Sequence, residues 1–275
     1  MKDGIPRYNF DQVLSDDKTL YNWLVGLEQI GLSILEGCPT TEGTLRVLGE
    51  RVSHLKRTNY GEIFTVKAKM DPSNLAYTSL ELGMHTDLPY YDYAPGVQML
   101  HCLKQVPTQG GENEFVDCFQ VGELMRKYHP EEFELLTTLP IDYKDVGADS
   151  YNFHLLNKLR VIELDNEGAI VRIVWNNMMR DSFLTGVQLE RVKPLYKAMK
   201  LFHDLMYHKD NVITTKLEAG EMVCFHNYRV LHGRTRFEVT EKGERHYEGA
   251  YLDWDEVSSR RRTIKRSIEP DTFGY

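Results

Sequence analysis

The sequence predicts a mainly β fold with helical insertions, which we expect to be a distorted double-stranded β-helix (jelly roll) buttressed by α-helices. From residue 60 onward, short runs of β-branched and aromatic residues alternate with Gly, Pro and Asn, a pattern typical of all-β folds. Segments with helical periodicity precede and interrupt these runs. The chain has 275 residues, of which 41% are hydrophobic, so it can bury a substantial core, and we expect one domain over residues 1–275.

Helical periodicity begins near the N-terminus. There, Asp16 or Asp17 can cap a helix that has an apolar stripe, and Gly31 can end it. A later segment, around residue 200, has the one-sided apolar stripe of a helix that packs on a core. Four segments are expected to be helical: residues 16–31, 41–55, 120–136 and 188–208.

The expected strands are short and are separated by turn-forming residues. One of them, LSILEG, directly follows the first helix. The others are IFTVKA, GVQMLHCL, NEFVDCF, VIELD, IVRIVW, MVCFHNYRVLH and HYEGAYLDW. Because strands dominate the middle and end of the chain, side chains from an early and a late strand can meet at one mouth of a jelly roll.

The charge distribution argues against a nucleic-acid-binding protein. The net charge is −8 and the pI about 5.7, with acidic and basic residues interspersed, whereas nonspecific nucleic-acid binding needs a concentrated basic surface. A basic run near the C-terminus, Arg260–Arg262 with Lys265 and Arg266, is expected to be a solvated helix face. No apolar run approaches the ~20 residues of a membrane span, and MKDGIPRYNFDQVL has no features of a targeting signal. We therefore expect a cytoplasmic protein with neither a nucleic-acid nor a membrane partner.

Two further patterns carry no chemistry of their own. The four cysteines lack CxxC spacing and are expected to be reduced thiols; they are Cys38, Cys102, Cys118 and Cys224. Gly110–Gly111 stands in neither a GxGxxG nor a GxxxxGK context, so it predicts a turn rather than a phosphate loop.

The most informative motif is His85-Thr86-Asp87, together with the distant His232. On an extended segment, residues i and i+2 point to the same side, so His85 and Asp87 can bind one ion. Two histidines and one carboxylate are the ligands of the facial triad of non-haem Fe(II) enzymes, which leaves the opposite face of the ion open. The alternative is that Asp87 caps a turn before Pro89 and that both histidines are ordinary residues; the tripeptide by itself does not exclude it.

Five longer segments carry a family resemblance: SNLAYTSLELGMHTD, PGVQMLHCLKQVPTQGGENEFVD, VRIVWNNMMRD, FHNYRVLHGR and RHYEGAYLDWDEV. From about Phe10 to Arg262, the chain resembles the γ-butyrobetaine/trimethyllysine dioxygenase family, within the taurine dioxygenase-like Fe(II)/2-oxoglutarate oxygenases. The last segment favours the butyrobetaine branch. Family members usually carry a zinc-binding domain ahead of the catalytic domain. This chain begins where that domain would end and has no Cys/His cluster in its place. We therefore expect no structural zinc.

The resemblance implies roles for the motif residues. His85, Asp87 and His232 would be the catalytic iron ligands. Arg245 would bind the distal carboxylate of 2-oxoglutarate, a task that suits a planar guanidinium with bidentate hydrogen bonds. Arg234 would support this cofactor site from further away.

The resemblance also implies a trimethylammonium substrate, which aromatic faces recognise because the cation cannot donate a hydrogen bond. The matching cage positions are Tyr60, Phe64, Tyr77 and Tyr251, with Phe64 in place of the Trp expected in the butyrobetaine enzymes. Asn74 and either Asn176 or Asn177 would meet the substrate carboxylate. The tyrosines that follow the motif either line the pocket rim or alternate between the faces of a strand or loop; they are Tyr90, Tyr91 and Tyr93.

The activity implied is hydroxylation of γ-butyrobetaine to L-carnitine by O2, with release of succinate and CO2. Fe(II) and 2-oxoglutarate are the expected cofactor and co-substrate, ascorbate is a candidate reductant, and a homodimer is a candidate assembly. Three alternatives stay open: the same chemistry on trimethyllysine or another betaine, a non-catalytic jelly-roll binding protein, and a catalytically impaired paralogue.

Overall fold

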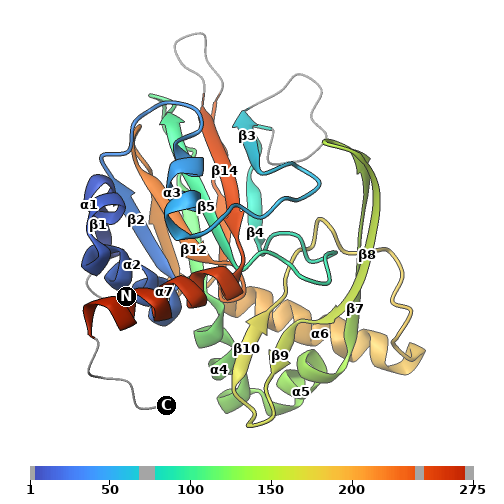
Figure 1. Cartoon of the computed structure of the whole chain (residues 1–275). Helices are drawn as coiled ribbons and strands as arrows, with labels where there is room; N and C mark the ends of the chain where they lie inside the picture. Colours follow the sequence, from blue (N-terminus) through green and yellow to red (C-terminus); the bar gives the residue numbers. More distant parts are fainter. Residues whose placement is uncertain (1–3, 68–77, 239–244, 270–275) are drawn as a thin grey trace.

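The computed structural model describes residues 4–67, 78–238 and 245–269, and its centre is formed by two β-sheets (Figure 1). In the larger sheet, the strand order is β1 (Arg7–Asn9), β2 (Leu32–Glu36), β12 (Met222–His226), β5 (Val97–Lys104), β14 (His246–Leu252) and β3 (Ile63–Lys67). The smaller sheet has the order β11 (Val212–Thr215), β6 (Asn113–Asp117), β13 (Val230–Arg234) and β4 (Leu82–His85). Apart from β1 and β2, neighbouring strands in both sheets are not consecutive in the chain, as in a double-stranded β-helix.

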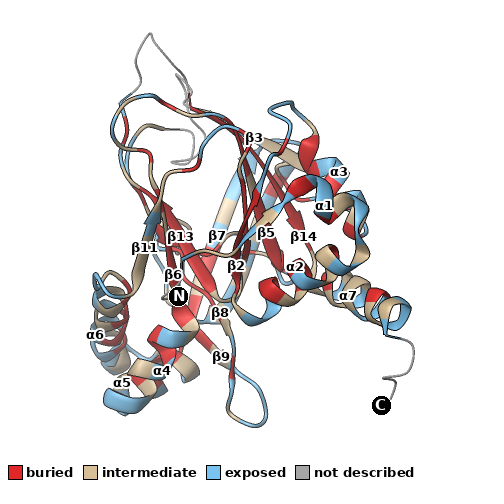
Figure 2. Ribbon diagram, turned by 90° about the vertical axis from the view of Figure 1, so that its left-hand side faces the viewer, coloured by how far each residue is buried: buried red, intermediate tan, exposed pale blue. Residues whose placement is uncertain are grey.

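The two sheets pack face to face through buried side chains. Phe115 on β6 and Phe225 on β12 have ring centroids 5.5 Å apart, and both belong to one hydrophobic cluster that includes residues of both sheets. Figure 2 shows that the buried residues concentrate on the strands between the layers of the molecule. The predicted jelly-roll class with buttressing helices is therefore confirmed.

Four helices cover the outer face of the larger sheet: α1 (Phe10–Ser15), α2 (Asp17–Gln29), α3 (Thr44–Val52) and α7 (Trp254–Ile268) (Figures 1 and 2). The start of α2 follows the sequence prediction, because the Asp16 carboxylate accepts the backbone N–H of Thr19. Its end does too, since Gly31 has a φ of 87° and turns the chain directly into β2.

A second group of helices packs beside the short strands β9 (Ile162–Leu164) and β10 (Ile170–Ile173): α4 (Cys118–Tyr128), α5 (Pro130–Thr138) and α6 (Leu189–Met206) (Figure 1). The single helix expected over 120–136 is in fact two. Proline disfavours the helical conformation of the residue before it and cannot donate a backbone hydrogen bond. His129 therefore ends α4, and Pro130 opens α5 as its first residue.

The run MVCFHNYRVLH, expected as one strand, is two strands in different sheets. A tight turn at residues 227–229 separates β12 from β13, with the Arg229 N–H bonded to the His226 carbonyl. This turn matters for the site because it carries the chain from the larger sheet to the strand of the smaller sheet that contains His232.

A long hairpin of β7 (Pro140–Ala148) and β8 (Asn152–Arg160) is a feature that the sequence analysis missed (Figure 1). Its tip is tied down by Ser150, whose hydroxyl donates to the carbonyl of Asn59, and β8 is tied by Asn157, whose amide donates to the carbonyl of Tyr91. Both anchors lie next to aromatic residues of the expected substrate site, so the hairpin buttresses that site.

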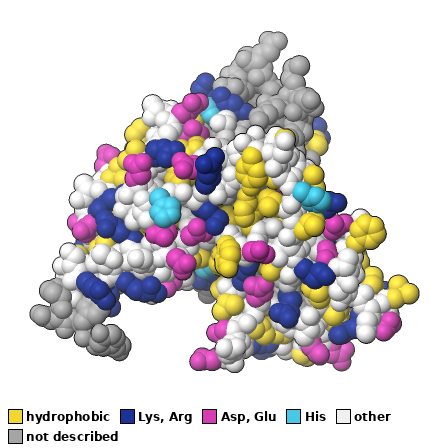
Figure 3. Space-filling model, turned by 45° about the vertical axis from the view of Figure 1, so that its right-hand side comes forward, with side chains coloured by type: hydrophobic (Ala, Val, Ile, Leu, Met, Phe, Trp, Pro, Cys, Tyr) yellow, Lys and Arg dark blue, Asp and Glu magenta, His cyan; other side chains and the backbone are white. Residues whose placement is uncertain are grey.

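The face turned forward in Figure 3 carries hydrophobic side chains intermingled with acidic and basic ones. Within the described part of the chain, none of the helices combines the length and the apolar character that a bilayer crossing requires.

Candidate active site

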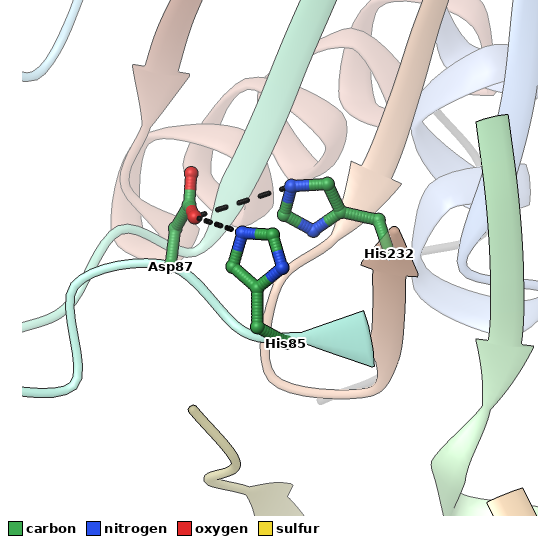
Figure 4. A group of neighbouring side chains, drawn as sticks. All are labelled: His85, Asp87 and His232. Atoms are coloured by element: carbon green, nitrogen blue, oxygen red, sulfur yellow. Dashed lines mark ion pairs between the residues drawn. The ribbon is translucent and has the colours of Figure 1, made fainter. Parts of the chain in front are cut away.

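His85, Asp87 and His232 converge at one end of the smaller sheet (Figure 4). His85 ends β4, and His232 lies directly opposite it on the antiparallel strand β13. The Nε2 atom of His85 is 3.2 Å from Asp87 Oδ1, and that of His232 is 4.0 Å from the same oxygen. Ligands at right angles and about 2.1 Å from one ion lie about 3 Å apart, so the His85 and Asp87 atoms match one ion, and His232 would move closer by about 1 Å to join them. The prediction that an early and a late strand meet here agrees with this geometry.

The chemistry of the donor atoms also fits a metal ion. His85 Nδ1 lies 2.8 Å from the Gly83 carbonyl, so it donates its proton there and leaves Nε2 free to accept an ion. Burial, reinforced by the neighbouring His85, lowers the pKa of His232 to about 3, so this imidazole is neutral. Burial by itself would raise the pKa of Asp87, but its interactions with His85, His232 and Tyr251 outweigh burial and hold that pKa below its ordinary value. The site therefore combines two imidazole nitrogens with an ionised carboxylate, a set typical of non-haem iron.

Asp87 is held by two side chains from distant parts of the chain. The Tyr251 hydroxyl on β14 donates to Asp87 Oδ2 over 2.6 Å. The buried Asn227, in the turn between β12 and β13, accepts the Asp87 N–H on its Oδ1 at 2.8 Å and donates from Nδ2 to the Asp87 carbonyl at 3.1 Å. Both the carboxylate and the backbone of this residue are thus fixed in place.

The residues on either side of Asp87 are equally constrained. The backbone N–H of Thr86 donates to the carbonyl of Trp175 at 2.7 Å, and the Thr86 hydroxyl accepts the N–H of Trp175 at 3.1 Å. Leu88, the next residue, has a φ of 57°, which is a strained value for a branched side chain. Such strain persists only where the surrounding contacts enforce it, and it clusters at functional sites.

Two adjoining hollows open on the triad and share Phe64, Val66, His85 and Asp87 in their walls. The first, the aromatic hollow of about 490 Å³, has four aromatic side chains in its wall. Tyr60 and Phe64 have ring centroids 5.8 Å apart, and Phe64 stacks on Tyr251 at 5.2 Å. Its wall consists of Tyr60, Phe64, Val66, His85, Asp87, Leu88, Tyr90, Asn176, Met178, Met179 and Tyr251.

The second hollow, of about 500 Å³, runs from the triad to Arg245 and Arg234. Arg245 is buried against the ring of Tyr247, with the guanidinium carbon 3.8 Å from the ring centroid. Its guanidinium donates a hydrogen bond to the amide oxygen of Asn113 at 3.4 Å, and among the described residues no carboxylate forms an ion pair with it. A buried guanidinium without an anionic partner is costly, so the end of this hollow is suited to an anion.

The other expected site residues have different positions. Arg234 donates to the carbonyls of Thr78 and Leu80, both at 2.7 Å, and so fixes the segment before β4 while it lines the second hollow. Asn176 lines the aromatic hollow, whereas the exposed Asn177 lines a separate surface hollow beside α6. Of the two alternatives, the structure therefore favours Asn176. Two further expected residues, Asn74 and Tyr77, lie outside the described residues.

Sequence reasoning missed some contacts and left others open. Tyr90 is buried in the aromatic hollow with its hydroxyl 3.4 Å from that of Tyr60, so it lines the pocket, whereas Tyr93 is exposed. Met178 and Met179 also line the hollow and had no sequence signal of their own. Asn227 is the third residue of the segment FHNYRVLHGR. Its place in that segment, next to a turn, was the signal that could have indicated it.

Comparisons with known proteins agree with this geometry. The family described as taurine catabolism dioxygenase TauD, TfdA matches residues 2–251. The chain belongs to this dioxygenase family. It is 41% identical to gamma-butyrobetaine dioxygenase of Homo sapiens over 265 residues, which cover 96% of this chain and 68% of the relative. It is 36% identical to gamma-butyrobetaine dioxygenase of Pseudomonas sp. (strain AK-1) over 263 residues, covering 96% and 67%. With the mitochondrial trimethyllysine dioxygenase of Gallus gallus, identity is 30%, covering 94% and 61%.

Solved structures show the same fold at low sequence identity. An asparagine oxygenase in complex with Fe(II), a hydroxyasparagine and succinate aligns with a TM-score of 0.66 and 14% identity, covering 92% of this chain and 83% of that one. The non-heme iron oxygenase OrfP, in complex with Fe and alpha-ketoglutaric acid, aligns with a TM-score of 0.62 and 11% identity, covering 91% and 94%. The family resemblance and the fold class predicted from the sequence are both confirmed, and the chain is an enzyme of the dioxygenase type.

Proposed function

We propose that this dioxygenase uses Fe(II) and 2-oxoglutarate to hydroxylate a trimethylammonium substrate, with γ-butyrobetaine as substrate and L-carnitine as product. The observation that carries the proposal is the position of the His85, Asp87 and His232 cluster where two adjoining hollows with different linings meet. One hollow has aromatic walls, and the other ends at the buried Arg245, which has no acidic partner among the described residues. The names of the relatives at 41% and 36% identity support the choice of substrate.

The cluster of His85, Asp87 and His232 would hold the iron through two Nε2 atoms and one carboxylate oxygen. Bound Fe(II) would supply the redox chemistry that couples O2 to decarboxylation of 2-oxoglutarate, giving succinate and CO2, and to hydroxylation of the substrate. His85 and Asp87 would be oriented before the ion arrives, because the Gly83 carbonyl holds His85 and the side chains of Asn227 and Tyr251 hold Asp87.

Arg245 would bind the distal carboxylate of 2-oxoglutarate at the closed end of the second hollow. Its planar guanidinium can make two parallel, charge-assisted hydrogen bonds, and burial strengthens them because water does not compete. The carboxylate would in turn neutralise a buried charge that has no acidic partner among the described residues. Arg234 would contribute positive charge near this end and hold the wall in place.

The aromatic hollow would bind the trimethylammonium group. Tyr60, Phe64 and Tyr251 form a continuous set of ring faces, and cations are attracted to such faces when water is excluded. Tyr90 adds a fourth aromatic wall. A fixed distance between this cage and the metal cluster would select which carbon of the substrate is oxidised.

Asn176 is the described residue best suited to the substrate carboxylate. Its Oδ1 accepts the backbone N–H groups of Met178 and Met179, so the amide orientation is fixed and Nδ2 can only donate. One of the two N–H groups of Nδ2 donates to the Thr86 carbonyl, so the other can donate to a ligand. We do not include Asn177 in the proposed site, because it lines a different hollow.

The deciding experiment measures succinate and hydroxylated product by mass spectrometry, with γ-butyrobetaine and trimethyllysine supplied separately together with Fe(II), 2-oxoglutarate and O2. We expect product from γ-butyrobetaine. Product from trimethyllysine alone would reassign the substrate, and no succinate with either would favour an impaired paralogue or a binding protein. His232→Ala should abolish metal binding and turnover, and preserved activity would exclude the assigned triad.

Arg245→Gln serves as the matched test of the co-substrate site. It should raise the KM for 2-oxoglutarate by about 100-fold, since a buried charge pair contributes about 3 kcal/mol to binding, while metal affinity stays unchanged. Four further points stay predictions from the sequence: a single catalytic domain over residues 1–275, ascorbate as reductant, a homodimer and a cytoplasmic location.

A further inference from the structure

Tyr251 contacts both the aromatic wall, through its ring, and the carboxylate of the metal cluster, through its hydroxyl. Its ring stacks on Phe64 with centroids 5.2 Å apart and forms part of the aromatic wall. Its hydroxyl leaves that wall and donates to Asp87 Oδ2 at 2.6 Å. The hydroxyls of Tyr60 and Tyr90, by contrast, lie 3.4 Å from each other.

The two oxygens of Asp87 are thereby given different environments. Oδ1 lies 3.2 Å from His85 Nε2 and 4.0 Å from His232 Nε2, at the point where the three ligand atoms converge. Oδ2 is engaged by the hydroxyl of Tyr251, which is itself almost completely buried. A short hydrogen bond to a charged carboxylate is among the stronger ones in proteins, so it can determine which oxygen faces an ion.

We propose that Tyr251 is a positioning residue for the metal centre and that its hydroxyl makes Asp87 a ligand through Oδ1 alone. This inference rests on the proposed iron site. A carboxylate that is free to rotate can bind an ion through both oxygens and then occupies an additional coordination position. Holding Oδ2 on Tyr251 keeps that position open for the co-substrate and O2.

The ring face of Tyr251 and its hydroxyl can be tested separately by substitution. Phenylalanine at this position keeps the ring face and its stacking on Phe64 but lacks the hydroxyl. A residue that acted only as cage wall would therefore tolerate Tyr251→Phe in every respect except a modest weakening of cation binding. A positioning residue would lose metal affinity instead.

The test is a titration of the metal-free protein with Co(II) alone, followed by its visible absorption bands, and then by addition of 2-oxoglutarate. We expect Tyr251→Phe to weaken Co(II) binding by about 10-fold to 100-fold, the usual effect of removing a group that orients a metal ligand. The absorption bands should also differ from those of the unaltered protein, because the carboxylate is no longer held to one oxygen. Tyr90→Phe removes the same atom from the same hollow and should leave Co(II) affinity unchanged.

The outcomes distinguish this inference from the proposed function. If the unaltered protein fails to bind Co(II), or if His232→Ala binds it equally well, the iron site itself is wrong. If the unaltered protein binds Co(II) and Tyr251→Phe has the same affinity and the same bands, only the role of Tyr251 is wrong. Equal losses in Tyr251→Phe and Tyr90→Phe would also overturn the inference, because they would indicate a general disturbance of the hollow.

Discussion

Asn227 is expected to support the proposed metal site without contacting the ion, because its amide is engaged in hydrogen bonds. Its Oδ1 accepts the Asp87 N–H, and its Nδ2 donates to the carbonyls of Asp87 and Pro95. One side chain thus joins the segment of the first histidine and the carboxylate to the turn that leads into β13 and His232. The perturbation we consider is Asn227→Ala.

The expected loss follows from those contacts. Three hydrogen bonds disappear, each with a net contribution of about 1 kcal/mol, so the free energy of unfolding should fall by about 3 kcal/mol. For a chain of this size, that corresponds to a decrease in Tm of roughly 6 to 12 °C. Because the Asp87 backbone is no longer fixed, Co(II) affinity should also fall by about 10-fold or more.

Urea denaturation of the metal-free protein measures the first effect, and Co(II) titration below the unfolding transition measures the second. Asn211→Ala is the matched control: the Asn211 side chain donates a hydrogen bond to the Leu205 carbonyl at 2.7 Å. Its loss should cost about 1 kcal/mol of stability without changing Co(II) affinity. If Asn227→Ala behaved like Asn211→Ala in both assays, the argument that this amide holds the site together would be refuted.

Two other substitutions test the hollow and the core. A Cβ at Gly249 would lie 2.2 Å from Cζ of Phe64, so Gly249→Ala should push that ring into the aromatic hollow. The KM for the betaine should rise, and the free energy of unfolding should fall by about 1–3 kcal/mol. An unchanged KM would show that the ring can move elsewhere. Burial and the charge of His246 lower the pKa of His101 to about 4. As the pH falls from about 6.5 to 4, the unfolded chain therefore takes up a proton that the folded protein does not, and the folded state loses up to about 3 kcal/mol. His101→Leu should remove this part of the acid sensitivity, measured by urea denaturation at pH 7 and pH 4.5, and an unaltered dependence on pH would contradict the assignment.

Local signals in the sequence were sufficient for some elements and misleading for others. The cap at Asp16 and the glycine at Gly31 act within a few residues, so the bounds of α2 followed from them. The hairpin of β7 and β8 was missed because much of it faces solvent: Val146 and Leu156 are 56% and 59% exposed. Its fully buried positions are few, Ile141, Tyr143 and Phe153, so its alternation of apolar and polar residues gave only a weak strand signal.

Within the site, neighbouring residues showed the limit of sequence reasoning. Asn176 and Asn177 are adjacent and of the same type, so composition could not choose between them. The choice depends on side-chain direction: Asn176 is held toward the aromatic hollow by its bond to Thr86, and Asn177 faces a hollow beside α6. The direction of the Asn176 side chain is therefore set by a contact with a segment 90 residues away in the sequence.

The sequence by itself indicated the ligand types of the proposed metal cluster and the family, because these depend on residue chemistry and on the order of residues along the chain. The family resemblance, in turn, pointed to Arg245 as the proposed residue for 2-oxoglutarate. Only the tertiary structure decided how the cluster is held. Asn227 and Tyr251 reach Asp87 across 140 and 164 positions of the chain, and their hydrogen bonds exist only once β4, β13 and β14 lie side by side or face to face. Such contacts depend on distances and directions between folded segments, and no local pattern in the sequence encodes them.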